Sequence, residues 1–561
     1  MDKEKKIKNR LEKIYKNSSE YLFSKILEKI NEFNSKMAKK EKYVLDEKKS
    51  VLIAYGDSIK NNGNSLETLE NFMKLFVGDS INTIHILPFF PYSSDDGFSV
   101  IDYKKVNPDL GDWQNIKNLS KSYYLMFDAV INHISSKSDW FKAFLNGEDK
   151  YKDYFIVENP EVDLSKVTRP RVFPLLSKYE TKNGLKYVWT TFSDDQIDLN
   201  YKNPELLLDI IDILLFYVSN GATLLRLDAI GYLWKKVGSN CIHLEETHEI
   251  IKLFKDIFDL LNRKVIIITE TNVPHKENIS YFGNGNDEAQ MVYNFSLAPL
   301  ILNAFQAHSS KNISKWIRSL EYPSEETTFF NFLASHDGIG LLPVKDILDE
   351  KEINILIEKV KKNNGKISYK KNSDGTNSPY EMNINYFDAL YDSTESEEQN
   401  IRKFLGAYFI AFSLRGVPGI YIHSLIGSRN WKEGVEKQKH NRAINREKIN
   451  YEHLLKELSD KKSFRHKIFT NMKEMLEIRK NYKSFSPVSE QEILDSEEGI
   501  LVIKRINKDE KIYCIINLTP DRKILNLSSV NLFEESVNLL NNEIIKEILK
   551  LESYEYVWLK I

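Results

Sequence analysis

The sequence predicts a closed (β/α)8 TIM barrel, an α/β fold with an inserted subdomain after its third strand and a small antiparallel β domain at its C-terminal end. Two observations lead to this prediction. From residue 50 onward, short runs of aliphatic and β-branched residues occur eight times, and most precede a longer segment with helical periodicity, such as LLLDIIDILLFYVSN. Alternation of strands and helices is typical of a parallel sheet, and eight repeats close into a barrel.

The eight runs also agree with the length of the chain. A chain of 561 residues would ordinarily hold about 3 to 4 domains, but an α/β barrel takes up about 250 residues or more as one unit. Each run is short and continuously apolar, as expected for a parallel strand that is covered on both faces. The predicted strands start at Val51, Thr83, Tyr124, Ala222, Lys264, Met291, Phe329 and Gly416.

Other regions flank or interrupt the predicted barrel. Residues 1–49 are rich in Lys and Glu with apolar residues at helical spacing, which predicts an N-terminal helical extension docked by one face. The catalytic barrel is expected to span residues 50–495, with insertions at about 134–198 and 343–395. The second insertion holds the polar segment KKNNGKISYKKNSDGTNSPYEMN, which we interpret as a long loop. Residues 496–561 alternate apolar runs with turn residues, which predicts a C-terminal β domain.

Charge and cysteine content exclude several classes of function. The chain carries 79 Lys and Arg against 81 Asp and Glu, a net charge of −2, whereas nucleic-acid binders usually show a basic excess. Cys241 and Cys514 can form neither a disulfide framework nor a metal site of the usual spacing. The sequence shows no signal peptide and no apolar run of about 18 residues, so we expect a cytoplasmic protein with no nucleic-acid or membrane partner. No oligomeric state follows from these features.

Polar residues close most of the predicted strands, and in a barrel the carboxyl ends of the strands hold the catalytic groups. Asp228, Glu270 and Asp337 are carboxylic acids that follow the fourth, fifth and seventh strands. Several acids at one rim suit either a metal site or glycoside chemistry. The other residues at or just beyond strand ends are Asp57, Asp95, Asn132, His133, Arg226 and His336.

The neighbours of two of these acids favour glycoside chemistry. Arg226 lies two residues before Asp228, so both side chains point to the same face of a strand. We expect the guanidinium to lower the pKa of Asp228 and to keep it ionised as a nucleophile. Glu270 closes the apolar run VIIIT, where burial is expected to raise its pKa towards that of a general acid. Such a pair, with its carboxyl groups about 5 to 5.5 Å apart, is typical of a retaining glycosidase.

Four segments together resemble the conserved regions of glycoside hydrolase family 13, the α-amylase family. They span most of the predicted barrel in the order expected for that family. The resemblance implies that Asp228 is the nucleophile, that Glu270 is the general acid/base, and that Asp337 binds sugar hydroxyls and stabilises the transition state. The segments are DAVINH from Asp128, LLRLDAIGY from Leu224, IIITE from Ile266 and FLASHD from Phe332.

Within that family the sequence is most similar to the sucrose phosphorylase subfamily. The segments that carry this resemblance are HILPFFPYSSDDGFSVIDYKKVNPDLGDW from His85, RPRVFPLL from Arg169, QIDLNY from Gln196, SHDGIG from Ser335 and NRAINRE from Asn441. The resemblance implies an acceptor or phosphate side near Arg171, Tyr232 and Tyr380, and it adds Gln196 and Asn272 to the substrate-binding residues. It implies a glucose subsite lined by Asp95, His133, Arg226, His336 and Arg442.

An anionic acceptor would need cations in this site. A phosphate dianion that enters among three carboxylates needs compensating charge, for which Arg171 and Arg442 are the candidates. No cofactor and no metal are implied. Asn132 occupies a position that some amylases use for calcium, but we expect it to have a hydrogen-bonding structural role here. Candidates for binding a negatively charged aglycone are Lys235, Lys236 and Lys276.

Departures from the sucrose-cleaving pattern fall on the acceptor side. Asn272 stands where those enzymes carry a histidine two residues after the acid/base. Ser378 and Glu381 flank Pro379 and Tyr380 where those enzymes have Asp and Gln. The segment ETNVPHKENISYFGNG and the long N-terminal extension are most similar to relatives that act on glucosylglycerate, with sucrose 6′-phosphate enzymes next. The resemblance therefore implies an aglycone other than fructose.

These observations predict a retaining α-glucoside phosphorylase. It would transfer glucose from an α-glucoside, such as glucosylglycerate or sucrose 6′-phosphate, to inorganic phosphate and give α-glucose 1-phosphate by double displacement. The alternatives are a sucrose phosphorylase proper, and an α-glucosidase or transglucosylase of the same family in which water or another sugar replaces phosphate. A catalytically inactive amylase-like binding or chaperone subunit is disfavoured, because the sequence keeps all three acids.

Overall fold

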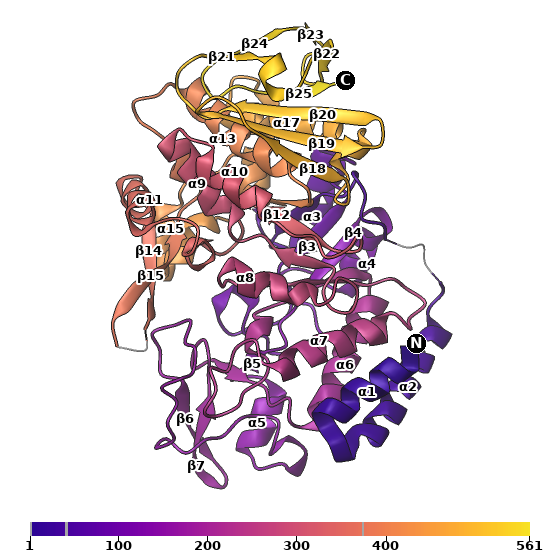
Figure 1. Ribbon diagram of the computed structural model, residues 1–561. Helices are drawn as coiled ribbons and strands as arrows, with labels where there is room; N and C mark the ends of the chain where they lie inside the picture. Colours follow the sequence, from indigo (N-terminus) through magenta and orange to yellow (C-terminus); the bar gives the residue numbers. More distant parts are fainter. Residues whose placement is uncertain (1–2, 40–42, 373–374) are drawn as a thin grey trace.

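A closed barrel forms the centre of the molecule. The computed structural model describes residues 3–39, 43–372 and 375–561. The parallel strands of the barrel follow the order β1-β16-β12-β11-β10-β9-β4-β3, with helices around them (Figure 1). Each strand coincides with one predicted run, so the predicted fold class is confirmed. The strands are β1 (Val51–Ala54), β3 (Thr83–Ile86), β4 (Tyr124–Ala129), β9 (Ala222–Leu227), β10 (Ile266–Thr269), β11 (Met291–Tyr293), β12 (Thr328–Phe332) and β16 (Val417–Tyr421).

Burial on both faces explains why these runs form strands. Every residue of β1, β3, β10 and β12 is buried, as expected for parallel strands between a core and a layer of helices. Helix α6 (Pro204–Ser219) illustrates how the sequence sets a helix limit, because Asn203 accepts the N–H of Glu205 and Pro204 occupies the first turn. Further helices of the barrel are α3 (Ser65–Phe72), α4 (Trp113–Ser122), α7 (Glu245–Phe258), α9 (Leu297–Ala307), α10 (Lys311–Arg318), α13 (Glu397–Ser413) and α17 (Phe464–Arg479).

Two helices precede the barrel and pack against its outer layer. Helix α1 (Lys3–Tyr15) contacts α7, and α2 (Ser19–Lys36) contacts α6 (Figure 1). Each helix buries one apolar face, including Leu11 of α1 and Ile26 of α2. Arg10 adds ion pairs to Glu249 and Asp256, at nitrogen-to-oxygen distances of 3.0 and 3.4 Å.

The chain between β4 and α6 forms a small subdomain that begins at the edge of the barrel. It contains α5 (Asp139–Leu145) and the antiparallel pair β6 (Leu176–Thr181) and β7 (Gly184–Trp189). Its two ends are joined by antiparallel pairing of β5 (His133–Ser135) with β8 (Gln196–Asp198), in which His133 is opposite Asp198 and Ser135 is opposite Gln196. This pairing brings His133 and Gln196 to the same rim of the barrel.

The segment interpreted as a long polar loop is instead a β-hairpin, so that interpretation is wrong. Strands β14 (Lys366–Lys371) and β15 (Asn377–Asn383) pair with each other and follow α11 (Glu350–Lys362). Strand β15 also pairs with β13 (Ile339–Gly340), which begins two residues after Asp337. Strand β14 has no buried residue, and only the last four residues of β15 are buried, so the alternation of apolar and polar residues that identifies a strand is weak here.

The C-terminal part of the chain forms an antiparallel sheet of six strands beside the barrel (Figure 1). The first strand of this sheet, β18 (Glu490–Leu494), ends before residue 495, where we place the end of the barrel, and it pairs with β19 (Ile500–Asn507). The limits that we assign to the domains stay predictions. No helix in the described ranges is both long enough and apolar enough to cross a membrane. The sheet consists of β18 (Glu490–Leu494), β19 (Ile500–Asn507), β20 (Glu510–Asn517), β25 (Tyr556–Lys560), β22 (Ser536–Asn538) and β23 (Ile544–Ile545).

Candidate active site

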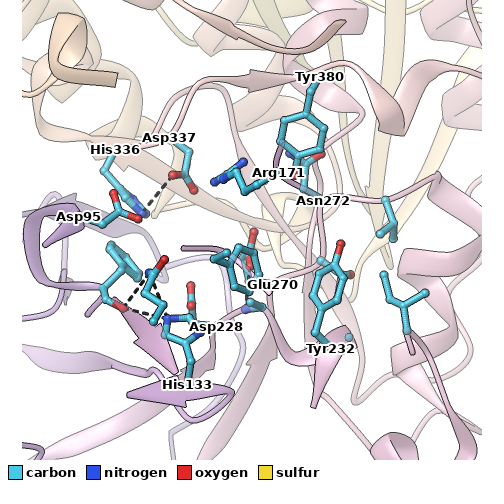
Figure 2. A pocket seen from close by; sticks show the side chains of 18 of the residues that line it. Asp95, His133, Arg171, Asp228, Tyr232, Glu270, Asn272, His336, Asp337 and Tyr380 are labelled. Carbon is cyan, nitrogen blue, oxygen red and sulfur yellow. Dashed lines mark hydrogen bonds and ion pairs between the residues drawn. The ribbon is translucent and has the colours of Figure 1, made fainter. Parts of the chain in front are cut away.

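A cavity opens at the carboxyl ends of the barrel strands (Figure 2). Strand ends, the subdomain after β4 and the β14–β15 hairpin all contribute to its lining. Of the residues predicted for the site, Arg226 does not line the cavity; it is 1% exposed and contacts Asp228 from the strand itself. The predicted residues that line the cavity are Asp95, His133, Arg171, Gln196, Asp228, Tyr232, Glu270, Asn272, His336, Asp337, Tyr380 and Arg442.

Arg226 connects neighbouring strands through buried charges. Its Nη1 atom lies 2.7 Å from Oδ1 of Asp228 and also pairs with Asp128, the residue opposite Arg226 in the register of β4 and β9. His85 of β3 contacts Asp128 in turn, with Nε2 2.7 Å from Oδ2. Because each charge has a partner, Arg226 is held in position by the protein alone.

Glu270 shares this guanidinium with Asp228. Its Oε2 atom lies 3.9 Å from Nη2 of Arg226 and accepts the backbone N–H of Ala229 at 3.0 Å. Burial raises the pKa of Glu270 to about 7; Arg226 opposes this shift, and the charges of Asp228 and Asp337 add to it. The predicted rise is confirmed. Near neutral pH such a carboxyl can donate a proton and later accept one.

The expected lowering of the Asp228 pKa is wrong. Burial raises the pKa of Asp228, and the like charge of Asp128 acts in the same direction, while Arg226 and His133 oppose the shift. The sequence indicates the nearby arginine but neither the depth of burial nor the second carboxylate on a neighbouring strand. The hydrogen bond from Arg226 nevertheless favours the ionised carboxylate that a nucleophile requires.

The turn after Asp228 contains a residue with a left-handed backbone. Ala229 has φ 48° and ψ 31°, a conformation that costs a residue other than glycine about 1 to 3 kcal/mol. This turn directs the Ala229 N–H at Glu270 and starts the short helix η5 (Ile230–Tyr232), whose last residue lines the cavity. The strained turn, which directly follows Asp228, therefore positions the Ala229 N–H next to Glu270 and places Tyr232 in the cavity lining.

Arginines hold Asp337 in its ionised form. Nη1 of Arg442 lies 2.5 Å from Oδ1 of Asp337, and Nη2 of Arg446 lies 3.9 Å from the same oxygen. Burial alone would raise the pKa of Asp337, but Arg442 and the other positive charges around it hold that pKa well below its usual range. Arg442 also pairs with Glu381 at 3.1 Å. Arg442, one of the two arginines expected to compensate the charge of phosphate, is therefore already bound to two carboxylates.

Two histidines and a glutamine surround Phe98 at one side of the cavity. The ring of His336 stacks on Phe98 at a centroid distance of 4.6 Å, and burial holds the pKa of His336 well below its ordinary value. His336 is therefore neutral, with Nδ1 buried and unbonded among the described residues. His133 and Gln196 both donate to the carbonyl oxygen of Phe98, at 2.9 and 3.2 Å. These rings and amides can donate to or accept from sugar hydroxyls.

Asp95 stands on a strained loop at the same side. Asp95 and Asp96 have φ values of 52° and 48°, and Gly97 follows with φ 114°. A Cβ atom at Gly97 would lie 2.6 Å from the carbonyl oxygen of Pro88, so the chain requires glycine there. Arg446 anchors the loop, with Nη1 2.9 Å from Asp96 and 3.6 Å from Asp95.

The opposite side of the cavity holds the residues predicted for the acceptor. Figure 2 shows Tyr232, Asn272 and Tyr380 on that side of Glu270. The guanidinium of Arg171 lies 5.6 Å from the ring centroid of Tyr380 and 6.0 Å from that of Phe192. Within the part of the chain that the structure describes, no carboxylate forms an ion pair with Arg171. The positive charge of Arg171 is therefore available to pair with an anionic ligand.

Asn272 packs against the backbone of β13. A Cβ atom at Gly340 would lie 2.4 Å from Oδ1 of Asn272, so the amide fits only because residue 340 is glycine. This oxygen is buried and has no hydrogen-bond partner among the described residues. A donor on a ligand could satisfy it.

Asn132 has the hydrogen-bonding role that we expected, and its partner is a lysine. Nζ of Lys235 lies 2.8 Å from Oδ1 of Asn132 and 2.5 Å from Oδ2 of Asp198. Lys235 is 5% exposed and does not line the cavity, so the suggestion that it binds an aglycone is wrong. Lys236 and Lys276 are exposed and are likewise absent from the cavity lining.

Sequence reasoning did not predict the contacts that support the site from behind the cavity lining. Asp128 contacts Arg226 and is itself bound by His85, and Glu381 contacts Arg442. None of these three supporting residues lines the cavity, and each partner is distant in the sequence. Arg446 follows Arg442 by four residues in NRAINRE, a spacing that could have indicated a second arginine on the same side. Asp57, a strand-end candidate, instead pairs with Lys448 at 2.6 Å outside the cavity.

Comparisons with known proteins agree with this geometry. The family described as the catalytic domain of α-amylase matches residues 76–343. A glucosylglycerate phosphorylase of Spirochaeta thermophila is 48% identical over 478 residues, which cover 85% of this chain and 81% of the relative. The chain belongs to the α-amylase family, glycoside hydrolase family 13. It is an enzyme of that family.

Other members of the α-amylase family align over most of the chain. A glucosylglycerate phosphorylase of Escherichia coli is 44% identical, and the match covers 92% of each chain. A sucrose phosphorylase of Streptococcus mutans is 29% identical, with 82% of this chain and 93% of the relative covered. The crystal structure of a sucrose 6F-phosphate phosphorylase from Thermoanaerobacter thermosaccharolyticum superposes with a TM-score of 0.76 at 24% identity, covering 90% of this chain and 99% of that one. This last match shows the shared fold.

Proposed function

We propose that this enzyme is a retaining α-glucoside phosphorylase whose donor is glucosylglycerate. One observation carries the choice of phosphorolysis: an arginine without a carboxylate partner in the described chain, Arg171, lies against Tyr380 on the acceptor side of the two acids. A partly buried guanidinium without a counter-ion is suited to bind an anion. The relatives at 48 and 44% identity, both called glucosylglycerate phosphorylases, support this choice of donor.

The first half of the reaction forms a covalent intermediate. Glu270, protonated because burial raises its pKa to about 7, donates its proton to the glycosidic oxygen. Asp228 attacks the anomeric carbon as the bond to this oxygen breaks, which gives a β-glucosyl ester and releases the aglycone. Asp337 binds ring hydroxyls, and Arg226 stabilises the charges of Asp228 and Glu270 throughout the step.

The second half of the reaction reverses the roles. Glu270, now ionised, accepts a proton from phosphate, and a phosphate oxygen attacks the anomeric carbon. The bond to Asp228 breaks, so that α-glucose 1-phosphate leaves and the acid pair returns to its starting form. Two inversions give net retention of configuration.

A single cation can serve both anions of this scheme. Glycerate leaves before phosphate enters, as in any ping-pong reaction, so the two anions occupy the acceptor side in turn. Arg171 is placed to pair first with the carboxylate and then with the phosphate. Arg442 is unsuited to this role, because Asp337 and Glu381 already share its charge.

Hydrolysis of an α-glucoside and phosphorolysis of sucrose are the competing functions. Asn272, which stands where the sucrose-cleaving enzymes carry a histidine, is the observation that favours an aglycone other than fructose. A cytoplasmic location and the absence of a cofactor belong to the proposal as well.

A screen of donors tests the proposal. The purified enzyme is incubated with inorganic phosphate and either glucosylglycerate, glucosylglycerol, sucrose or sucrose 6′-phosphate, and glucose 1-phosphate and free glucose are both measured. We expect the highest kcat/KM with glucosylglycerate and glucose 1-phosphate as the main product. Equal rates with and without phosphate, with glucose as product, would assign the enzyme to the hydrolases instead.

A further inference from the structure

The β14–β15 hairpin is joined to the Asp337 segment by one buried carboxylate. Glu381 of β15 is 1% exposed and lies opposite Gly340 of β13. Its Oε1 atom accepts the backbone N–H of Gly338 at 2.8 Å. A Cβ atom at Gly338 would lie 2.5 Å from Cγ of Glu381, so this side chain packs directly on the backbone that follows Asp337.

The same carboxylate holds Arg442 from one side. Oε1 of Glu381 lies 3.1 Å from Nη2 of Arg442, and Oε2 lies 3.3 Å from Nε. Nη1 of the same guanidinium pairs with Asp337 at 2.5 Å. Glu381 therefore fixes the orientation of Arg442, the arginine that contacts Asp337. The two carboxylates together neutralise the positive charge of this arginine.

Glu381 also determines where its neighbour on the strand lies. The register of the hairpin shifts here, because Glu381 is opposite Ser368 and Pro379 is opposite Tyr369, so Tyr380 is the extra residue of a β-bulge directly before Glu381. Tyr380 lines the cavity with its ring 5.6 Å from the guanidinium of Arg171, whereas Glu381 does not line the cavity. A strand anchored through Glu381 therefore presents Tyr380 to Arg171 in one position.

From these contacts, and on the basis of the phosphorylase function proposed above, we propose that Glu381 is a positioning residue for the acceptor side. It holds the hairpin and Arg442 in register with Asp337, so that Tyr380 and Arg171 together receive the incoming phosphate. Glu381 is one of the departures from the sucrose-cleaving pattern, which agrees with a role on the acceptor side.

Two separate readouts distinguish positioning from a merely structural role. The burst of p-nitrophenol released from p-nitrophenyl α-glucoside reports formation of the glucosyl enzyme, and the KM for phosphate reports the acceptor side. In Glu381→Ala the pair between Arg442 and Asp337 remains, so we expect the burst rate to stay within about threefold while the KM for phosphate rises about tenfold or more. Glu381→Gln, which keeps an oxygen for the Gly338 N–H but loses the charge, should fall between the wild type and Glu381→Ala. Adding Tyr380→Phe to Glu381→Ala should raise this KM little further, because Glu381 acts through Tyr380.

A matched control and the opposite outcomes make the test decisive. Tyr369→Ala changes an exposed residue of the same hairpin and should leave both readouts unchanged. An unchanged KM for phosphate in Glu381→Ala, or an equal loss in both readouts for Glu381→Gln, would overturn the proposal. If the wild type forms no glucose 1-phosphate, the proposed phosphorylase function is wrong. Glu381 is then tested in the same variants by the rate of glucosyl transfer to glycerol, divided by the burst rate.

Discussion

Nη1 of Arg226 lies 2.7 Å from Oδ1 of Asp228, and Nη2 of the same guanidinium lies 3.9 Å from Oε2 of Glu270. A buried cation thus faces both acids of the proposed double displacement. Negative charge moves between these acids as the reaction proceeds, and it stays close to Arg226 in each step. The geometry of Arg226 therefore affects every transition state of the reaction.

Replacement of Arg226 by lysine should impair catalysis more than stability. Lysine keeps the charge but cannot bond Asp128 and Asp228 together, so we expect kcat to fall about 100-fold or more. Arg226→Leu should also unfold more readily, by about 3 to 5 kcal/mol, because it leaves buried carboxylates unpaired. Steady-state kinetics and calorimetry measure both effects. The control is Arg402→Lys, at an exposed pair on α13; near-normal kcat in Arg226→Lys would contradict this role.

The pH dependence of activity should report Glu270. The proposed first step requires the protonated acid, and its pKa is about 7, so kcat/KM should fall as the pH rises through about 7. Donors whose leaving groups need no proton, such as α-glucosyl fluoride, should not show this alkaline limb. An unchanged limb with the fluoride would assign it to another group.

Glu270 should make the protein less stable as the pH rises, whereas a salt-bridged acid makes a protein more stable as the pH rises. The folded-state pKa of Glu270 lies above the ordinary value of 4.5, so the folded protein holds this proton more tightly than the unfolded chain does. Its contribution to stability is complete below about pH 4.5 and is lost as the pH rises to about 7. In Glu270→Gln the free energy of unfolding should fall less over this interval than in the wild type.

Substitution of the two acids should separate their roles. Asp228→Asn removes the nucleophile, so we expect kcat to fall about 1,000-fold or more with every donor. Glu270→Gln should lose about 100-fold or more with glucosylglycerate but much less with α-glucosyl fluoride, and it should accumulate the glucosyl enzyme. Mass spectrometry of the intact protein detects this ester. Its absence from Glu270→Gln, with fluoride as donor and no phosphate, would argue against a covalent intermediate.

Arg171 should act on the anions alone. Arg171→Gln removes the charge that faces the acceptor side, so the KM for phosphate and for glycerate in the reverse reaction should both rise about tenfold or more. The burst of p-nitrophenol from a neutral aryl glucoside should stay close to that of the wild type. If only one of the two KM values changed, the two anions would not share this arginine.

Lys235 should stabilise the fold without contributing to catalysis. Its Nζ atom joins Asn132 to Asp198, so Lys235→Met leaves a buried carboxylate without its cation and should cost about 3 to 5 kcal/mol of stability. The adjacent exposed residue provides the control, Lys236→Met, which should change stability little. Thermal unfolding measures the difference in stability between the two variants. Because Asn132 is bound by Lys235 and no metal is proposed at this position, EDTA should not alter the melting temperature of the wild type.

The barrel could be predicted because its signal is local. Each strand is a short apolar run, most of these runs are closed by a polar residue, and both features are visible in the sequence. The β14–β15 hairpin was missed because its strands, KISYKK and NSPYEMN, lack a continuous apolar face. They form a three-stranded sheet because β15 pairs with β14 on one side and with the earlier strand β13 on the other.

The predicted site residues other than Arg226 line one cavity, but their electrostatics were predicted only in part. The rise of the Glu270 pKa follows from one apolar run, so the sequence sufficed for it. The net shift of Asp228 depends on Asp128 and on burial, both set by strand packing. Likewise, the binding of Arg442 to Glu381 arises only when the hairpin folds against the barrel rim. The separation of the two catalytic carboxyls stays a prediction.

The most direct test of the central claim is a product count from one donor. Wild-type enzyme is given glucosylglycerate and saturating phosphate, and glucose 1-phosphate, its anomeric form and free glucose are measured in the same samples by NMR. The proposed mechanism predicts that the α anomer of glucose 1-phosphate exceeds free glucose by about tenfold or more, and that omitting phosphate stops donor consumption almost completely. Free glucose as the main product at an unchanged rate without phosphate, or the β anomer of glucose 1-phosphate, would contradict it.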